Sequence, residues 1–159
     1  MTTIENLLGA DATLGTLLDQ RRTIMELTEA SGTAVLTPRE PGGLPHGLRA
    51  AIALRVAAAV QDEELMAHYR ERLEACPGGV GFAAFALPGT MPEDARLAAI
   101  LRHADLLTAE PRQATRGDIE ALQAAGVTEP DIVRLAELCA FLAYQARLLT
   151  GLRLLRNAR

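Results

Sequence analysis

The chain has 159 residues, enough for one domain that buries about 70% of the surface its unfolded form exposes, so folding requires neither a disulfide nor a metal. Its formal net charge is −4 and its basic residues are spread along the chain, which argues against a surface for nucleic-acid phosphates. All 16 basic residues are Arg, which excludes Schiff-base lysine chemistry, lipoyl or biotin attachment and a P-loop lysine. We therefore expect no cofactor and no nucleic-acid partner.

The amino terminus, MTTIENLLGADATLGTLLDQRR, has no basic start, no long apolar core and no small-residue cleavage site, so it is unlike a secretory signal. The long uncharged stretch from Ala75 to Pro92 is interrupted by prolines and glycines that a membrane-spanning helix tolerates poorly. These features predict a cytoplasmic protein with no membrane partner. In such a reducing compartment, the widely separated Cys76 and Cys139 are not expected to form a structural disulfide.

Apolar residues recur at helical spacing along almost the whole chain, and strict alternation over four or more residues is absent, so we expect an all-α fold. The first helix is predicted from about Leu14 to Glu29, ending near Ser31 and Gly32. A linker rich in turn residues, 37–43, then leads to a second helix over about 45–60.

Asp62 is a natural N-cap for the third predicted helix, about 63–75. The Pro- and Gly-rich segment that follows, to about Gly89, is expected to be a loop. The sequence Thr90-Met91-Pro92-Glu93 has the pattern of a capping box and predicts a fourth helix that continues to about Thr108.

Thr115 and Asp118 predict the start of a short fifth helix, which Gly126 closes. Thr128 repeats the start signal and opens a sixth helix to about Leu155, roughly 40 Å long at 1.5 Å per residue. This last helix is apolar over most of its circumference, which is typical of a helix at the centre of a domain or between subunits. We therefore expect a homo-oligomer, from dimer to hexamer.

Three stretches together resemble the alkylhydroperoxidase D-like and carboxymuconolactone decarboxylase superfamily, particularly its peroxidase-related branch. They are LTPREPGGLPHGLRAAIALRVAAAV, EDARLAAILRHADLLTAEPRQATRGDIEALQAAGVTEPDIV and AELCAFLAYQARLLTGL. The resemblance implies a single domain over 1–159, with an N-terminal helical extension over 1–36 and a family core over 37–159. It also implies an oligomeric helical bundle of about six helices, with a redox site between helices and a role in antioxidant defence.

The family's peroxidase site combines a glutamate, a Cys-x-x-Cys pair and a histidine, because one thiolate attacks the peroxide and the second resolves the sulfenic acid. Two alignments are possible here, with either Tyr69 or His68 in the position of the histidine. Neither places a cysteine at the positions of the pair. We therefore expect a diverged protein that is non-catalytic for thiol peroxidase chemistry.

The candidate site residues are His68, Glu64 and Arg147. Glu64 precedes His68 by four residues, so the two share a helical face, and Arg147 lies in the apolar last helix. A decarboxylase-like enzyme would use these three groups on a small carboxylated substrate. The alternatives are a solvated ion-pair ladder around His68, a salt bridge for Arg147, and a structural subunit in a hetero-oligomer with a cysteine-bearing relative. No two histidines have metal-ligand spacing on one helix, so we expect no metal.

Overall fold

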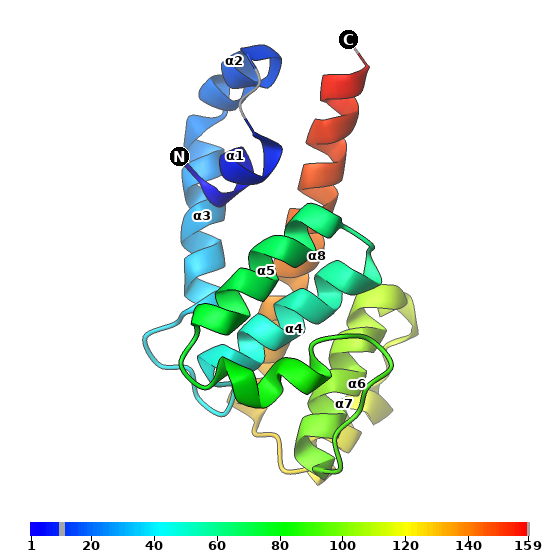
Figure 1. Ribbon diagram of the computed structural model, residues 1–159. Coiled ribbons are helices and arrows are strands. Elements are labelled where there is room, and N and C mark those ends of the chain that lie inside the picture. The colour runs from blue at the N-terminus through cyan, green and yellow to red at the C-terminus, as the bar shows by residue number, and fades with distance from the viewer. Residues whose placement is uncertain (10–11, 159) are drawn as a thin grey trace.

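The computed structural model describes residues 1–9 and 12–158, and within them the regular structure is entirely helical (Figure 1). This confirms the predicted all-α class. The α-helices are α1 (Thr3–Leu8), α2 (Ala12–Gln20), α3 (Arg22–Leu36), α4 (His46–Ala59), α5 (Glu63–Ala75), α6 (Ala95–Ala109), α7 (Arg116–Ala124) and α8 (Glu129–Asn157). Two 3₁₀ helices, η1 (Gly79–Phe85) and η2 (Pro111–Gln113), lie in the connections. No helix of the described residues is long and apolar enough to cross a membrane.

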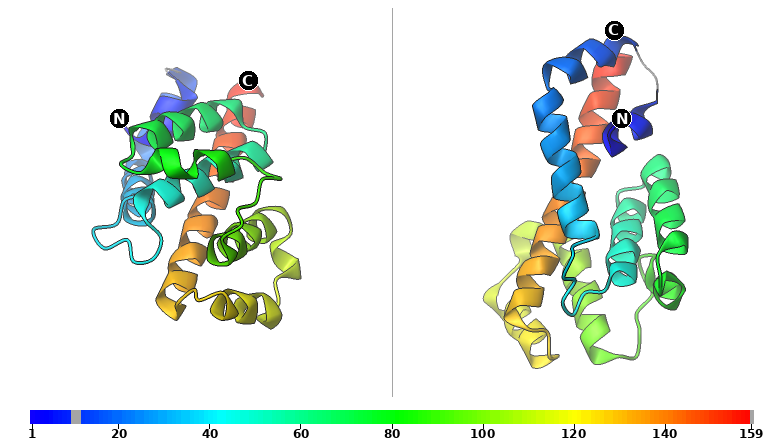
Figure 2. Two further views of the ribbon diagram at one scale, coloured as in Figure 1. Left: turned by 60° about the horizontal axis from the view of Figure 1, so that its bottom comes forward. Right: turned by 90° about the vertical axis from the view of Figure 1, so that its left-hand side faces the viewer.

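The long helix α8 is the centre of the fold. It contacts α1, α2 and α3 toward its carboxyl end and α4, α6 and α7 along the rest of its length (Figures 1 and 2). Its fully buried side chains include Leu135, Leu138 and Leu149. Much of the apolar circumference of this helix is therefore covered within the chain itself.

The pair α4 and α5 crosses one side of α8, and the 3₁₀ helix η1 packs against both members of the pair (Figure 1). Helix α4 is buried from Gly47 to Ala57 on every face, which explains why its side chains are mostly small or aliphatic. Helix α5 begins at the predicted position, directly after Asp62. The Asp62 carboxylate accepts a 3.0 Å hydrogen bond from the Leu65 N–H. The predicted starts of α7 and α8 are confirmed as well: the Thr115 N–H and hydroxyl donate to the Asp118 carboxylate, and the Thr128 hydroxyl accepts from the Asp131 N–H.

The amino-terminal region differs from the prediction of one helix over 14–29. The chain breaks at Arg21, between α2 and α3, and α3 continues past Ser31 and Gly32 to Leu36. Gly32 is not a helix end because the ring of Phe141 on α8 lies against it, and a Cβ there would be 2.8 Å from Phe141 Cζ. Burial against α8 therefore stabilises the helix through this glycine.

The start of α6 was also predicted wrongly. The helix begins at Ala95, after Asp94, whose carboxylate accepts a 2.6 Å hydrogen bond from the Leu97 N–H. Residues 90–93 belong to the preceding loop, where the Thr90 carbonyl accepts a hydrogen bond from Arg55. That loop also contains the 3₁₀ helix η1, which the Pro and Gly content of the segment did not predict.

Candidate functional site

The three predicted site residues do not share one pocket. Glu64 is exposed and accepts a 2.7 Å hydrogen bond from Arg153 of α8. His68, one turn later on α5, lines a small cleft beside α3. Arg147 lies on another face of α8 and lines a larger pocket near α4 and α6. The structure therefore offers two places to examine, which we call the His68 cleft and the Arg147 pocket.

The His68 cleft lies between α1, α3, α5 and α8 and has a volume of about 30 Å³, room for about two water molecules. Beneath it the Tyr69 hydroxyl donates a 2.5 Å hydrogen bond to Gln145 Oε1. Burial, together with the positive charge of Arg72, lowers the pKa of His68, so its imidazole is neutral at pH 7. A neutral imidazole can accept a proton, but the cleft leaves almost no space for a substrate.

Helix α1 covers part of this cleft. The Thr3 N–H and the Thr3 hydroxyl donate hydrogen bonds of 2.7 and 2.9 Å to the two carboxylate oxygens of Glu29 on α3. Ile4, which also lines the cleft, is only 1% exposed. The His68 cleft is thus a narrow junction between four helices, partly covered by α1.

The Arg147 pocket has a volume of about 390 Å³ and lies where α4 ends beside α6 and α8. Its walls are mostly aliphatic, and hydroxyls from two threonines, Thr108 and Thr150, lie among them. Both hydroxyls donate to carbonyls of the preceding helical turn. The apolar wall residues are Val56, Val60, Ala143, Ala146, Gly151 and Leu154.

Arg147 supplies the pocket's uncommitted positive charge. It is exposed, and its guanidinium donates one 3.2 Å hydrogen bond, to the carbonyl of Ala143 in the preceding turn. None of the ion pairs within the described residues involves Arg147. A guanidinium has five N–H donors. Those of Arg147 form no ion pair with a carboxylate of the described residues, so they are available to a ligand.

The other ionised group of the pocket, Asp62, is already paired. Arg153 donates hydrogen bonds of 2.5 and 3.3 Å to the two oxygens of the Asp62 carboxylate. Burial alone would raise the pKa of Asp62, but the bonds from Arg153 and from the Leu65 N–H outweigh it and lower that pKa. The Asp62 charge is therefore balanced locally, and Arg147 stays available for an anion.

No disulfide joins the two cysteines of the chain. Cys76 and Cys139 are both free thiols. Burial raises the pKa of Cys139 to about 12, so this thiol is protonated at neutral pH and is a poor nucleophile. Cys76 ends α5, and its thiol lies 3.7 Å from the Pro77 carbonyl. Within the described residues, no cluster of His, Cys, Asp and Glu could hold a metal ion.

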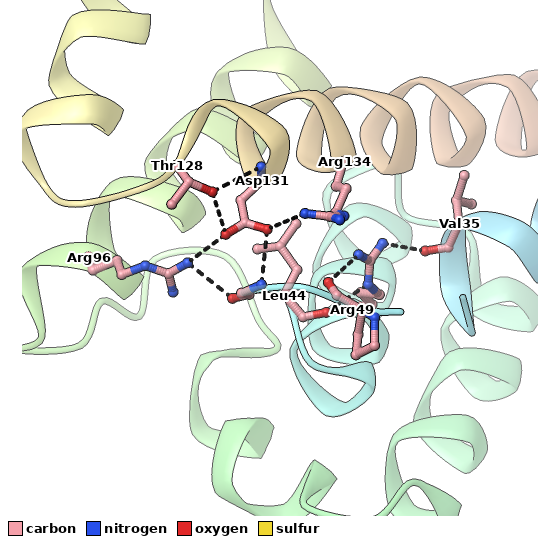
Figure 3. Close-up of polar contacts among 9 residues, drawn as sticks. Val35, Leu44, Arg49, Arg96, Thr128, Asp131 and Arg134 are labelled. Carbon is pink, nitrogen blue, oxygen red and sulfur yellow. Dashed lines mark hydrogen bonds and ion pairs between the residues drawn. The ribbon is translucent and has the colours of Figure 1, made fainter. Parts of the chain in front are cut away.

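Sequence reasoning missed a polar cluster that holds the loop between α3 and α4 (Figure 3). Arg49 is 2% exposed and donates three hydrogen bonds of 2.7 to 2.9 Å to backbone carbonyls, those of Val35, Pro41 and Leu44. A buried Arg is rarely predictable from sequence, and its partners are backbone carbonyls of the last turn of α3 and of the loop, which carry no residue-type signal. Its role is to fix the path of the loop.

Asp131, in the first turn of α8, holds the same loop from the other side (Figure 3). Its carboxylate accepts a 2.9 Å hydrogen bond from the Gly43 N–H and ion-pairs with Arg96 and Arg134 at 3.4 and 3.0 Å. Burial would raise the pKa of Asp131, but the hydrogen bonds from Gly43, Thr128 and Arg134 lower it overall. This carboxylate is fully engaged and leaves no free group for catalysis.

Arg55 plays the corresponding part for the loop before α6. It is 1% exposed, forms hydrogen bonds of 2.6 and 2.7 Å with both carboxylate oxygens of Asp105, and donates to the carbonyls of Phe85, Leu87 and Thr90. The two buried arginines of α4 thus fix two loops and are structural.

Comparison of the chain with protein-family models, with curated proteins and with solved structures finds no match. Family membership is therefore not shown. The resemblance to the alkylhydroperoxidase D-like superfamily rests on the three quoted stretches alone.

Proposed function

We propose that this chain binds a small carboxylic acid with an apolar body in the Arg147 pocket, and that it carries out no thiol peroxidase chemistry. The observation that carries the proposal is an uncommitted guanidinium on the edge of an aliphatic pocket of about 390 Å³. Pockets that hold small organic ligands have volumes of about 300–1,000 Å³, mostly apolar walls and a few polar groups that fix orientation. The Arg147 pocket meets all three conditions.

The charge and shape of Arg147 favour a carboxylate. A guanidinium forms two parallel hydrogen bonds with a planar carboxylate, a geometry that an alcohol or an amide does not provide. The aliphatic side chains of Val56, Val60 and Leu154 would then contact the apolar body of the ligand. Short acids such as acetate lack that body, so they should bind more weakly.

The resemblance fits a binding role better than an enzymatic one. A relative of the alkylhydroperoxidase D-like proteins that lacks the Cys-x-x-Cys pair would retain a helical pocket without the dithiol. A decarboxylase-like mechanism needs acid–base groups beside the anion-binding Arg. Here His68 lies in a different cleft and Glu64 pairs with Arg153. We therefore rank the decarboxylase-like and the antioxidant functions below ligand binding.

Calorimetric titration with matched ligand pairs tests the proposal. Octanoate and benzoate carry the carboxylate, whereas octanol and benzamide have similar bodies without the charge. Because a hydrogen bond to a charged group contributes about 1.5–3 kcal/mol, we expect each acid to bind about 10-fold to 150-fold more tightly than its neutral counterpart. Equal affinity within a pair would contradict the proposal.

A variant pair locates the site. Arg147→Gln should remove the preference for the acids, whereas Arg116→Gln should retain it, because Arg116 is an exposed residue of α7 outside the pocket. Leu154→Glu places a like charge beside the ligand and should also weaken acid binding. Unchanged octanoate affinity in Arg147→Gln would place the binding site elsewhere.

A further inference from the structure

A second surface, on a different face of α8, is apolar and uncovered. Helices α3 and α8 lie side by side there (Figure 2, right). Their side chains line a groove of about 640 Å³. Ile24 and Leu27 of α3 and Tyr144 of α8 line it, and these side chains are 51%, 59% and 42% exposed. Three large, half-exposed apolar side chains in one groove favour a contact with another protein surface.

The two helices run antiparallel, and one contact between them marks the same height along both helix axes. Thr28 Oγ1 of α3 lies 2.9 Å from Tyr144 Oη of α8. Arg21 lies seven residues before Thr28, and Glu137 lies seven residues before Tyr144. Seven residues are about two helical turns, so Arg21 and Glu137 stand at equal distances on opposite sides of this height.

We propose that two copies of this chain associate through the α3–α8 groove, related by a two-fold axis at the level of Thr28 and Tyr144. Because this axis lies midway between the heights of Arg21 and Glu137, it places Arg21 of one copy at the same height as Glu137 of the other. The symmetry repeats this pairing, so each dimer contains it twice. No ion pair within the described part of the chain involves Arg21 or Glu137. Each therefore has its charge available for a partner, and the surface is electrostatically complementary to itself.

The shape of the groove is also complementary to itself. On α3 the larger side chains, Ile24 and Leu27, come before Thr28, whereas the smaller ones, Ser31, Ala34 and Val35, come after it. The two-fold axis reverses this order in the partner, so the large residues of one copy meet the small end of the other. Such interdigitation is how packed helices fill their grooves.

The size of the surface sets the expected strength. The 15 residues of α3 span about 22 Å, and two adjacent helices are about 20 Å wide, so each copy contributes a footprint of about 440 Å². Together the two copies approach 900 Å², the size of a weak or transient interface. We therefore expect a dimer that dissociates on dilution. This inference is independent of ligand binding, since Arg147 faces a different pocket.

Light scattering coupled to size-exclusion chromatography over a range of protein concentrations tests the dimer. The expected mass rises with concentration from 17.0 kDa toward twice that value. A mass that stays at 17.0 kDa up to about 100 times the lowest concentration would overturn the proposal. So would a dimer that remains intact in Leu27→Glu, which places like charges close to the two-fold axis. Val80→Glu is the matched control, because Val80 is 81% exposed on η1, outside the groove, and its variant should dimerise like the parent.

Charge reversal tests the two-fold axis itself without touching apolar residues. Arg21→Glu and Glu137→Arg should each weaken the dimer by about 5-fold or more, and the double variant should recover most of the loss. Both positions are exposed, so the variants should fold, as circular dichroism can verify. Two single losses that simply add in the double variant would show that Arg21 and Glu137 do not meet, and would overturn this geometry.

Discussion

The Tyr69 hydroxyl on α5 donates a 2.5 Å hydrogen bond to Gln145 Oε1 on α8, and both side chains are buried. Tyr69 and Gln145 are 76 positions apart in the chain, so the bond joins two helices that are distant in sequence. Tyr69→Phe should destabilise the fold by about 1–3 kcal/mol, since it leaves the Gln145 oxygen buried without a donor. Urea unfolding measures the loss. Tyr144→Phe is the matched control: Tyr144 is 42% exposed and, within the described residues, its hydroxyl contacts only the Thr28 hydroxyl, so water can replace it, and a loss as large as that of Tyr69→Phe would contradict this reasoning.

Arg55 should be the most sensitive charged residue for stability. Arg55→Met removes the partner of Asp105 and leaves the loop carbonyls that Arg55 binds without a donor. Breaking a buried ion pair from one side costs about 3–5 kcal/mol, and Asp105 keeps partial access to water, so we expect about 3 kcal/mol. Arg116→Met should cost less than about 0.5 kcal/mol, because Arg116 and Glu120 form an exposed pair. Equal losses in the two variants would refute the structural role of Arg55.

Stability should fall as the pH drops below about 6.5. Burial lowers the pKa of His103, and its Nδ1 is buried without a hydrogen-bond partner among the described residues. Between the ordinary pKa of 6.5 and the lower folded value, the unfolded chain binds more protons than the folded chain, so the free energy of unfolding falls as the pH is lowered through this range. His68 contributes with the same sign.

Urea unfolding at about pH 7.5 and about pH 5.5, on either side of the ordinary histidine pKa, measures this dependence. His103→Leu should reduce the difference between the two free energies, and combining it with His68→Gln should reduce it further. Carboxylates with lowered pKa values, such as Asp131, lose their contribution only near and below their ordinary value of 3.8. A difference that persists unchanged in the double variant would mean that the histidines do not cause it.

Peroxide should not produce a Cys76–Cys139 disulfide. The Cys139 thiol is buried and protonated, with a pKa of about 12, so it can neither attack a peroxide nor resolve a sulfenic acid at neutral pH. Mass spectrometry of the intact protein after treatment with an organic hydroperoxide should show no loss of two hydrogens. If that disulfide forms, and peroxide turnover disappears in Cys76→Ser, the chain is a thiol peroxidase after all.

The sequence by itself determined the helical class and several helix starts. The Asp62 and Thr128 side chains accept from N–H groups three residues further along the chain, and Thr115 donates to the Asp118 carboxylate over the same spacing, so these effects are local and readable from the sequence. Local signals failed where a distant contact was stronger. Gly32 looked like a helix end, yet the packing of Phe141 against it, from more than 100 residues away, keeps α3 continuous to Leu36.

Only the tertiary structure decided how the candidate site residues are placed. Glu64 and His68 are one turn apart on α5, and spacing alone suggested a single site. Glu64, however, lies beside Arg153, whereas His68 lies beside α3 under the cover of α1. Arg147 joins neither, because its position on α8 directs it toward α4 and α6. Spacing fixes which side chains share a helical face, but which neighbour covers each part of that face depends on helix packing between distant segments.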